Sequence, residues 1–428
     1  MLPDPRSHRP LIMGRRGAVA TNHPLATQAG FDVLRAGGNA VDASVAISFA
    51  LGVVEPMMSG IGGDGFYQIA LAGSGEGICY NGTGAAPEQA TVERYRKEGG
   101  IPVSGPLSTS IPGTVAGIAA MHKAHGKLPW SKLFDTAIHY ARDGFAATHG
   151  YSHFAGENKK ILSADKRSGR VFLDPKTGEA PEVGSLIVQE DLARTLEEIA
   201  ADGAEGFYRG KLARRLAAAC QAQGVLLTER DLASCQAERV APISIRYRGY
   251  EVRQTPPNST GFVMLQELKI AERFDLKSLK PGSPELIHIL LECRKRAFLD
   301  RERYGTDPRH GTVPLERLLS DAYAEECAAA IDRNRAAPHV PFSAAAGGDT
   351  TYYCVVDAEG NTVSAIQSIN SAFGSGVTAG DTGILLNNRM AYWHLEDGHA
   401  NQLKPGKRVR HTMNAPLVMK EDRKSTRL

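Results

Sequence analysis

A helix-forming stretch of mostly apolar residues, 39–53, most constrains how this chain can fold. Asn39 can cap a helix there, and Ala, Val, Ile and Leu then dominate every side of it. A helix that is apolar nearly all round has no face suited to water, so it belongs in the interior. We therefore expect this helix to be buried beneath other elements.

Helical spacing recurs along the first three quarters of the chain. It predicts further helices that span residues 24–35, 114–126, 131–142, 191–200, 211–223, 262–273 and 285–303. In the last of these, Leu290 is expected on the same side of the helix as Ile289 and Cys293. Residues 66–71 and 241–252 are predicted as strands.

Composition places the chain among ordinary globular proteins. It has 428 residues, 42% hydrophobic and 23% charged, with a net charge of only +3. Such a balance favours neither nucleic acid nor a membrane surface as a partner. The first twenty residues lack the apolar core of an export signal, and six scattered cysteines are typical of free thiols. These features together predict a cytoplasmic protein.

The segment from Gly347 to Asp357 carries the clearest chemical signal. An irregular stretch, residues 333–349, runs into strand-like residues that begin with Thr350 and Thr351. Residues 350–357 and 361–369 are predicted to pair as a hairpin. Cleavage between Asp349 and Thr350 would divide the chain into a large subunit, 1–349, and a small one, 350–428.

Such a cut would make Thr350 an N-terminal nucleophile. A hydroxyl needs a base within reach, and a free α-amine, with a usual pKa of about 7.7–8.0, can serve. This chemistry requires neither a metal nor a cofactor. The alternative is that Thr350 and Thr351 are simply β-branched residues of a strand.

Several motifs, in one order, decide between these interpretations. They are Gly37–Ala43, Gly62–Phe66, Pro112–Gly117, Tyr247–Tyr250, Pro256–Pro257, Asp349–Thr351 and Gly380–Asn388. The ordered set resembles the γ-glutamyltranspeptidase family of N-terminal-nucleophile hydrolases, over residues 20 to about 418. Each motif by itself is weak, but the ordered set is specific.

The resemblance implies an α+β fold, a four-layer αββα sandwich. It implies self-cleavage before Thr350 and transfer of an acyl group from an amide, such as glutathione or another γ-glutamyl compound, to water or an amine. Ser368 matches a hydroxyl residue that hydrogen-bonds the nucleophile, and Asn370 matches a substrate-binding asparagine. For Ser368 and Asn370 the alternative is a polar strand end.

The chain departs from the family pattern in the substrate pocket. Thr83 stands in place of an arginine, Arg389 and Tyr392 in place of a glutamine and an aspartate, and His411 with Thr412 in place of paired serines. An α-ammonium group would meet Arg389 without a carboxylate partner.

Two interpretations of Arg389 remain open, and a further possibility concerns the whole protein. Arg389 could hold a carboxylate on a smaller acyl group, as in the branch that is similar to oxamate amidohydrolase and the cephalosporin acylases. It could equally be a solvated surface charge, and the basic run from Lys404 to Arg410 is expected on a solvated face. A third possibility is an unprocessed, inactive family member.

The end of the sequence also departs from the family. Residues 421–428 are charged, and no Pro-Gly-Gly turn, which supplies the family's oxyanion hole, follows Pro416. We therefore expect a truncated small subunit. Loss of an oxyanion donor costs about 10²–10³ in rate, so we expect this product to be weakly active or inactive.

Overall fold

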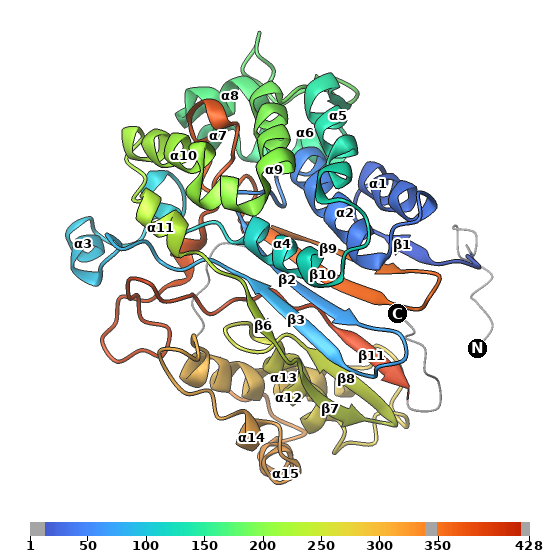
Figure 1. Cartoon of the computed structure of the whole chain (residues 1–428). Helices are drawn as coiled ribbons and strands as arrows, with labels where there is room; N and C mark the ends of the chain where they lie inside the picture. The colour runs from blue at the N-terminus through green and yellow to red at the C-terminus, as the bar shows by residue number, and fades with distance from the viewer. Residues whose placement is uncertain (1–12, 339–348, 421–428) are drawn as a thin grey trace.

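The computed structural model describes residues 13–338 and 349–420, and their elements form four layers (Figure 1). A six-stranded sheet crosses the middle of the molecule. One group of helices lies above it, and a three-stranded sheet with a second group of helices lies below. This layering confirms the predicted α+β sandwich.

The central sheet is antiparallel throughout, in the order β1-β9-β10-β2-β3-β6. Its strands are β1 (Ala18–Ala20), β9 (Asp349–Val356), β10 (Thr362–Asn370), β2 (Asp64–Ala70), β3 (Gly77–Gly82) and β6 (Glu238–Val240). The predicted hairpin of β9 and β10 is confirmed. The hairpin lies between β1 and β2, so the chain from Asp349 onward is built into the middle of the sheet.

The second sheet has the order β11-β8-β7, with β11 (Leu417–Lys420), β8 (Tyr250–Gln254) and β7 (Ile243–Tyr247). The single strand predicted for residues 241–252 is wrong, because the chain reverses within it. Arg248 and Gly249 have φ values of 49° and 83°. Two successive left-handed residues make the tight turn of a two-residue hairpin.

The upper helices cover the central sheet. They include α1 (Pro24–Arg35), α2 (Ala40–Val54), α4 (Thr114–His125), α5 (Asp135–Asp143), α9 (Glu190–Arg209) and α10 (Lys211–Ala222). Asn39 and Asp42 form a capping box at the start of α2, and every residue of α2 is buried, as predicted. The helix predicted from residue 131 begins instead at Asp135, after a short 3₁₀ helix, η2 (Trp130–Leu133).

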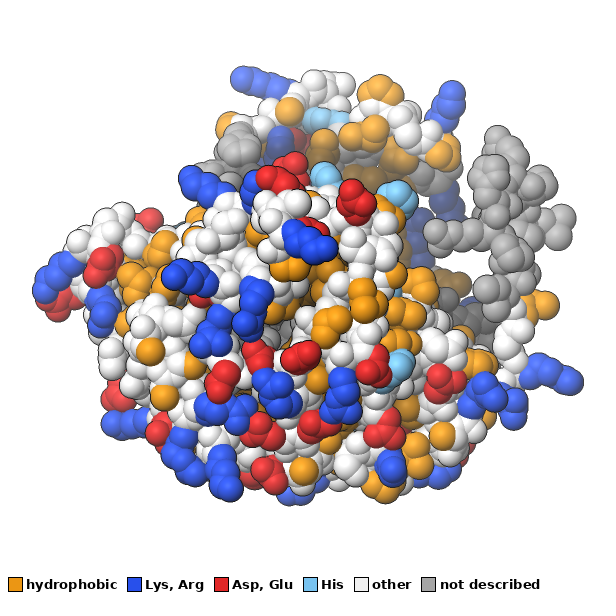
Figure 2. Space-filling model, turned by 90° about the horizontal axis from the view of Figure 1, so that it is seen from above, with side chains coloured by type: hydrophobic (Ala, Val, Ile, Leu, Met, Phe, Trp, Pro, Cys, Tyr) orange, Lys and Arg blue, Asp and Glu red, His pale blue; other side chains and the backbone are white. Residues whose placement is uncertain are grey.

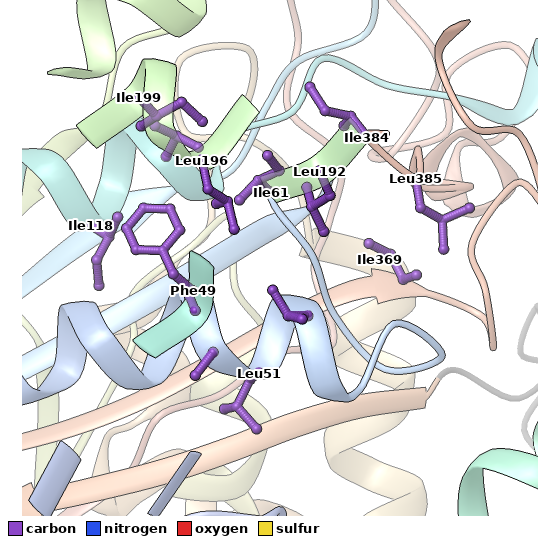
Figure 3. Close-up of a cluster of buried hydrophobic side chains, with 14 of the residues drawn as sticks. Phe49, Leu51, Ile61, Ile118, Leu192, Leu196, Ile199, Ile369, Ile384 and Leu385 are labelled. Atoms are coloured by element: carbon purple, nitrogen blue, oxygen red, sulfur yellow. The ribbon is translucent and has the colours of Figure 1, made fainter. Parts of the chain in front are cut away.

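The main core lies between α2, its neighbouring helices and the sheet (Figure 3). Figure 3 labels Phe49, Leu51, Ile61, Ile118, Leu192, Leu196, Ile199, Ile369, Ile384 and Leu385. Close packing of such side chains resists small displacements. Because Ile369 of β10 belongs to this core, the end of β10 is held firmly against the helix layer.

The lower helices are α12 (Gly261–Ala271), α13 (Pro284–Tyr304), α14 (Leu315–Leu318) and α15 (Asp321–Ala329). α12 packs on β7 and β8, and α13 packs on α12. Ile289 and Cys293 of α13 are buried, but Leu290 is 45% exposed, so the side predicted to hold all three is wrong for Leu290. Successive residues of a helix point about 100° apart, and Leu290 falls outside the narrow stripe that α12 covers.

The remaining elements are short. They are α3 (Val92–Lys97), α6 (His149–Glu157), α7 (Lys159–Ala164), α8 (Lys166–Phe172), α11 (Glu229–Ser234), β4 (Phe145–Ala146) and β5 (Leu186–Ile187), with the 3₁₀ helices η1 (Pro106–Ser108) and η3 (Gly380–Thr382). Within the described ranges, no helix combines the length and apolar character that a bilayer crossing requires.

Seen from above the helix layer, the surface carries both signs of charge (Figure 2). Lys and Arg side chains lie intermixed with Asp and Glu over this face, in line with the net charge of +3. A mixed surface of this kind produces only a weak long-range field.

Candidate active site

A β-bulge lies opposite Thr350. Gln367 of β10 pairs with Thr351 of β9, but Asn370 pairs with Asp349, so β10 carries one extra residue across from Thr350. Bulges redirect side chains and are over-represented beside active sites. The half-buried Thr350 therefore faces an irregular part of the ladder made by Ser368 and Ile369.

The bulge brings the predicted hydroxyl residue next to the predicted nucleophile in the sheet. Ser368 is buried, and its Oγ accepts a hydrogen bond of 2.7 Å from the backbone N–H of Asn370. On its other side, Ser368 pairs with Asp64 at the start of β2. This position agrees with the predicted role of Ser368 and does not test it.

Asn370 is held in one orientation. Its φ of 88° is left-handed, which few residues other than glycine adopt easily. Its side-chain Oδ1 accepts a hydrogen bond of 3.2 Å from Arg389 Nη1, and its Nδ2 donates one of 3.1 Å to the carbonyl of Asn388. One donor and one acceptor site of this amide are therefore used within the protein, which leaves one of each.

Arg389 begins the short 3₁₀ helix η4 (Arg389–Tyr392) and is only 1% exposed. Its Nε lies 3.4 Å from Asp64 Oδ2, and its Cζ lies 5.6 Å from the centre of the Tyr392 ring. The possibility that Arg389 is a solvated surface charge is therefore wrong. The long side chain crosses the interior because a buried carboxylate lies at its far end.

His411 completes this group, which we call the Asp64 cluster: Asp64, Arg389 and His411. His411 Nε2 lies 3.3 Å from Asp64 Oδ2. Burial, and then the nearby Arg389, lower the pKa of His411 to about 4. His411 is thus neutral at pH 7, and the charges of Asp64 and Arg389 cancel.

Several polar atoms of the Asp64 cluster have unused bonding capacity. Among the described residues, Asp64 Oδ2, Arg389 Nε and both ring nitrogens of His411 lack a hydrogen bond of good geometry. Buried polar atoms are normally paired, and here Arg389 Nε and His411 Nε2 face Asp64 Oδ2 at 3.4 and 3.3 Å without forming well-aligned hydrogen bonds.

Asp64 was missed as a site residue by the sequence analysis. Its other oxygen, Oδ1, accepts a hydrogen bond of 2.8 Å from the backbone N–H of Gly84, which fixes the carboxylate. An acidic residue between glycines, immediately before a buried strand, was the signal that could have identified it.

Two predicted residues adjoin the cluster, but their side chains have other surroundings. Thr83 is buried, but its hydroxyl donates to Asn81 Oδ1 at 2.7 Å and accepts from Asn258 Nδ2 at 3.2 Å. Thr412 is exposed, although it follows His411 in the chain. The structure therefore brings together Ser368, Asn370, Arg389, Tyr392 and His411, but gives Thr83 and Thr412 other surroundings.

The basic run near the end of the chain is a solvated face only at Lys404, and the expectation is wrong for its other three cations. Lys407, Arg408 and Arg410 are all buried. Arg408 pairs with Glu238, and Arg410 Nη2 lies 3.0 Å from Glu302 Oε2. The two arginines are buried because each finds an acceptor in a distant part of the chain, whereas Lys407 donates to the nearby carbonyls of Ala400 and Gln402.

Among the residues that the structure describes, one group of side chains has the composition of a metal site. Ligand atoms of Glu302, His394 and His399 lie within 4.8 Å of one another. The Glu302 carboxylate, however, already contacts Arg410 and accepts a hydrogen bond of 2.7 Å from Arg301. Two adjacent guanidinium groups oppose a dication, so we assign no metal to this group.

Comparison with known proteins identifies the family. The profile of the family described as Gamma-glutamyltranspeptidase matches residues 26–427. The chain belongs to the γ-glutamyltranspeptidase family. As a member of it, the protein is an amide hydrolase or acyltransferase of the N-terminal-nucleophile class, and its relatives are made as proenzymes.

Relatives in the γ-glutamyltranspeptidase family cover nearly all of this chain. The glutathione hydrolase-like YwrD proenzyme of Bacillus subtilis is 40% identical over 96% of this chain and 77% of its own length. The oxamate amidohydrolase proenzyme of Klebsiella pneumoniae is 37% identical over 95% of this chain and 77% of its own. The crystal structure of cephalosporin acylase from Bacillus halodurans superposes with a TM-score of 0.88 at 36% identity, over 99% of this chain and 79% of that chain.

The expected boundary between subunits is only partly described. Most of the irregular stretch, residues 339–348, lies outside the described residues. Its first part rests on α13: Arg333 pairs with Glu285, and the Ala337 N–H donates to Glu292 Oε1 at 3.1 Å. The cleavage between Asp349 and Thr350 therefore stays a prediction. The truncation of the small subunit also stays a prediction, because residues 421–428 lie outside the described residues.

Proposed function

We propose that this γ-glutamyltranspeptidase-family enzyme cleaves itself before Thr350 and then hydrolyses amides whose small acyl group carries a carboxylate but no α-ammonium. One observation supports this choice above the others. Asp64, the buried acid beside Asn370 and Ser368, is already neutralised by Arg389 at 3.4 Å.

Self-cleavage follows from the chemistry of a threonine. The Thr350 hydroxyl oxygen attacks the carbonyl carbon of Asp349, the C–N bond breaks, and its nitrogen takes up a proton to become the α-amine. Water then hydrolyses the resulting ester, which returns the Thr350 hydroxyl and leaves the Asp349 carboxylate. The position of Thr350 opposite a bulge supports this, because it exposes the residue at an irregular point of the ladder.

Substrate turnover would use the same residue twice. The Thr350 α-amine takes the hydroxyl proton while the oxygen attacks the substrate amide, and the leaving amine receives that proton. Water, or a second amine, then releases the acyl group from the ester. Ser368, one strand away, is proposed to hydrogen-bond the Thr350 oxygen and hold it for attack.

The preference for the acyl group rests on charge. An α-ammonium needs a carboxylate with no competing partner, but Asp64 is shared between Arg389 and His411. It would also meet the buried guanidinium of Arg389 as a like charge. A carboxylate on the acyl group would be attracted by Arg389 and opposed by Asp64, but it can accept hydrogen bonds from the guanidinium, which an ammonium cannot.

A second candidate function is turnover of glutathione or another γ-glutamyl compound. It is favoured by the Bacillus subtilis relative, whose name describes it as glutathione hydrolase-like. The Klebsiella and Bacillus halodurans relatives, an oxamate amidohydrolase and a cephalosporin acylase, favour the first candidate.

Intact mass tests the self-cleavage. We expect fragments that end at Asp349 and begin at Thr350, and a single uncut chain for Thr350→Ala. Thr350→Ser is the matched control, because it keeps a hydroxyl and should still be cut. A Thr350→Ala protein that is cut at the same bond would overturn the assignment of Thr350.

A matched pair of substrates tests the acyl group. Glutaryl-4-nitroanilide and γ-glutamyl-4-nitroanilide differ only by the α-amino group. We expect a kcat/KM at least 10-fold higher for the glutaryl compound. Mass spectrometry should also detect the acyl group on the fragment that begins at Thr350. Equal or faster turnover of the γ-glutamyl compound would favour the second candidate. Turnover of glutathione and of oxamate can be measured in the same way.

We further propose that the protein acts in the cytoplasm, on small amides and with water or an amine as acceptor. The six cysteines support this location, since none is disulfide-bonded and free thiols are usual in reducing compartments. Detection of the protein in a periplasmic or secreted fraction would contradict it.

A further inference from the structure

Glu55 is a buried carboxylate that the proposed reaction does not yet use. It follows the last residue of α2 and is 3% exposed. Its Oε2 accepts a hydrogen bond of 2.9 Å from Thr351 Oγ1, and its Oε1 accepts one of 2.8 Å from Asn22 Nδ2. Burial raises the pKa of Glu55, and these two hydrogen bonds only partly oppose that effect.

The contact with Thr351 places Glu55 close to the proposed nucleophile. Thr351 directly follows Thr350, and successive side chains of a strand point to opposite faces. Thr350 therefore faces the reaction, while the fully buried Thr351 faces α2 and Glu55. A hydrogen bond that holds Thr351 also holds the backbone of Thr350.

The surroundings of Glu55 contain no compensating cation. Gln367, opposite Thr351, hydrogen-bonds Ser48 and Ser59, which are neutral. Two titratable groups lie on the adjoining elements. Tyr353, two residues along the same face of β9, has a pKa that burial raises, and His23, which follows Asn22, has a pKa that burial lowers. Both are neutral at pH 7, so no positive charge of the described residues pairs with Glu55.

An unpaired buried carboxylate is costly unless something favours it. Self-cleavage creates a positive charge, the α-ammonium of Thr350, one residue from the Thr351 that contacts Glu55. We infer that Glu55 is the counter-charge of this α-ammonium and, through Thr351, the positioning residue of the nucleophile. The inference rests on the proposed role of Thr350, but not on which acyl group the enzyme prefers.

The counter-charge has a defined consequence for catalysis. When the α-amine takes the hydroxyl proton, it becomes an ammonium in the transition state. A negative charge nearby in a low-dielectric interior favours this ammonium and makes the amine a stronger base. The Asp64 cluster, with no net charge, cannot supply this effect.

The decisive variant is Glu55→Gln, which keeps the size of the side chain and removes the charge. We expect cleavage to persist but kcat for the anilide to fall about 3- to 10-fold, with KM nearly unchanged. The acidic limb of the kcat pH profile reports protonation of the Thr350 α-amine. Because loss of the nearby negative charge makes this amine a weaker base, the limb should move to lower pH by about half a unit or more. A residue with only a packing role would not move that limb.

A second pair of variants tests the link through Thr351. Thr351→Val removes the hydroxyl with little change of shape and should lower kcat and slow self-cleavage. Thr351→Ser restores the hydroxyl and should recover both rates. This pair also covers the case in which Glu55→Gln does not fold.

Tyr353→Phe is the matched control. It removes a buried hydroxyl from the same face of β9, where Tyr353 contacts Ser44 Oγ at 3.0 Å, but leaves Glu55 and Thr351 intact. We expect it to lower stability without moving the pH limb. The inference is overturned if Glu55→Gln shifts the limb no more than Tyr353→Phe, or if Thr351→Val matches the parent. An uncut parent chain, or cleavage in Thr350→Ala, would instead remove the proposed nucleophile and the inference with it.

Discussion

Two buried carboxylates lie beside the β9–β10 hairpin, and their surroundings differ. Asp64 lies within 3.4 Å of Arg389 and 3.3 Å of His411, in a cluster whose charges cancel. Within the described part of the chain, the Glu55 side chain accepts hydrogen bonds from the neutral Thr351 and Asn22 alone.

The difference shows how one site can use buried charge in two ways. A carboxylate beside a permanent cation is already neutralised, so it offers little to a positively charged ligand. One without a cation can respond to a charge that the reaction creates. We therefore assign acyl-group selection to the Asp64 cluster and support of the nucleophile to Glu55.

Of the variants considered, loss of Arg389 should lower the free energy of unfolding most. Arg389→Met leaves Asp64 buried and uncompensated, and we expect the free energy of unfolding to fall by about 3–5 kcal/mol in denaturant titrations. The double variant Asp64→Asn with Arg389→Gln should recover much of the loss.

An exposed ion pair provides the control for Arg389. Arg96 and Asp397 lie 3.0 Å apart with side chains 50% and 78% exposed. Arg96→Met should change the free energy of unfolding by less than about 1 kcal/mol. A similar small effect of Arg389→Met would show that Arg389 does not compensate Asp64.

The next largest expected effect is on the pH dependence of stability, which should differ between His411 of the Asp64 cluster and Glu55. The pKa of His411 is lowered in the folded protein, so the unfolded chain binds its proton first as the pH falls. The stability that neutral His411 contributes is present above about pH 6.5 and is lost toward about pH 4. We expect a loss of roughly 1–3 kcal/mol across this window, which His411→Asn should largely abolish.

Glu55 should produce the opposite slope. Its pKa is raised in the folded protein, so its contribution to stability is present below its unfolded pKa and is lost as the pH rises through the folded value. In the uncut Thr350→Ala protein, Glu55→Gln should therefore increase the free energy of unfolding at pH 7. Chemical denaturation at several pH values measures the pH dependence for both His411 and Glu55. The prediction for Glu55 would be contradicted if Glu55→Gln made the Thr350→Ala protein less stable at pH 7.

The smallest expected effect concerns the exposed end of the Glu55 contact. Asn22→Ala removes one hydrogen bond to Glu55, and water can reach the exposed Asn22 position. We expect a loss of about 0.5–1.5 kcal/mol in stability. A much larger loss would mean that Asn22, rather than Thr351, holds the carboxylate in place.

Local patterns predicted much of the fold. The capped helix α2 and the β9–β10 hairpin follow from residues close together in the chain, and both are confirmed. The β7–β8 turn was missed although Arg248-Gly249 carried a signal for it, since glycine favours the left-handed conformation such a turn needs. The burial of Arg389 had no local signal, because a charge is buried only when a distant partner exists.

The amino-acid sequence by itself determined the family, the layered fold and the residue proposed for attack, because these depend on motifs and periodicity along the chain. Only the tertiary structure decided which charges meet. Asp64 and Arg389, and likewise Glu55 and Thr351, are separated by about three hundred residues and approach only when β2, β9 and β10 join one sheet. Because electrostatic energy depends on distance and burial in space, the pairing of these charges could not be read from their order in the chain.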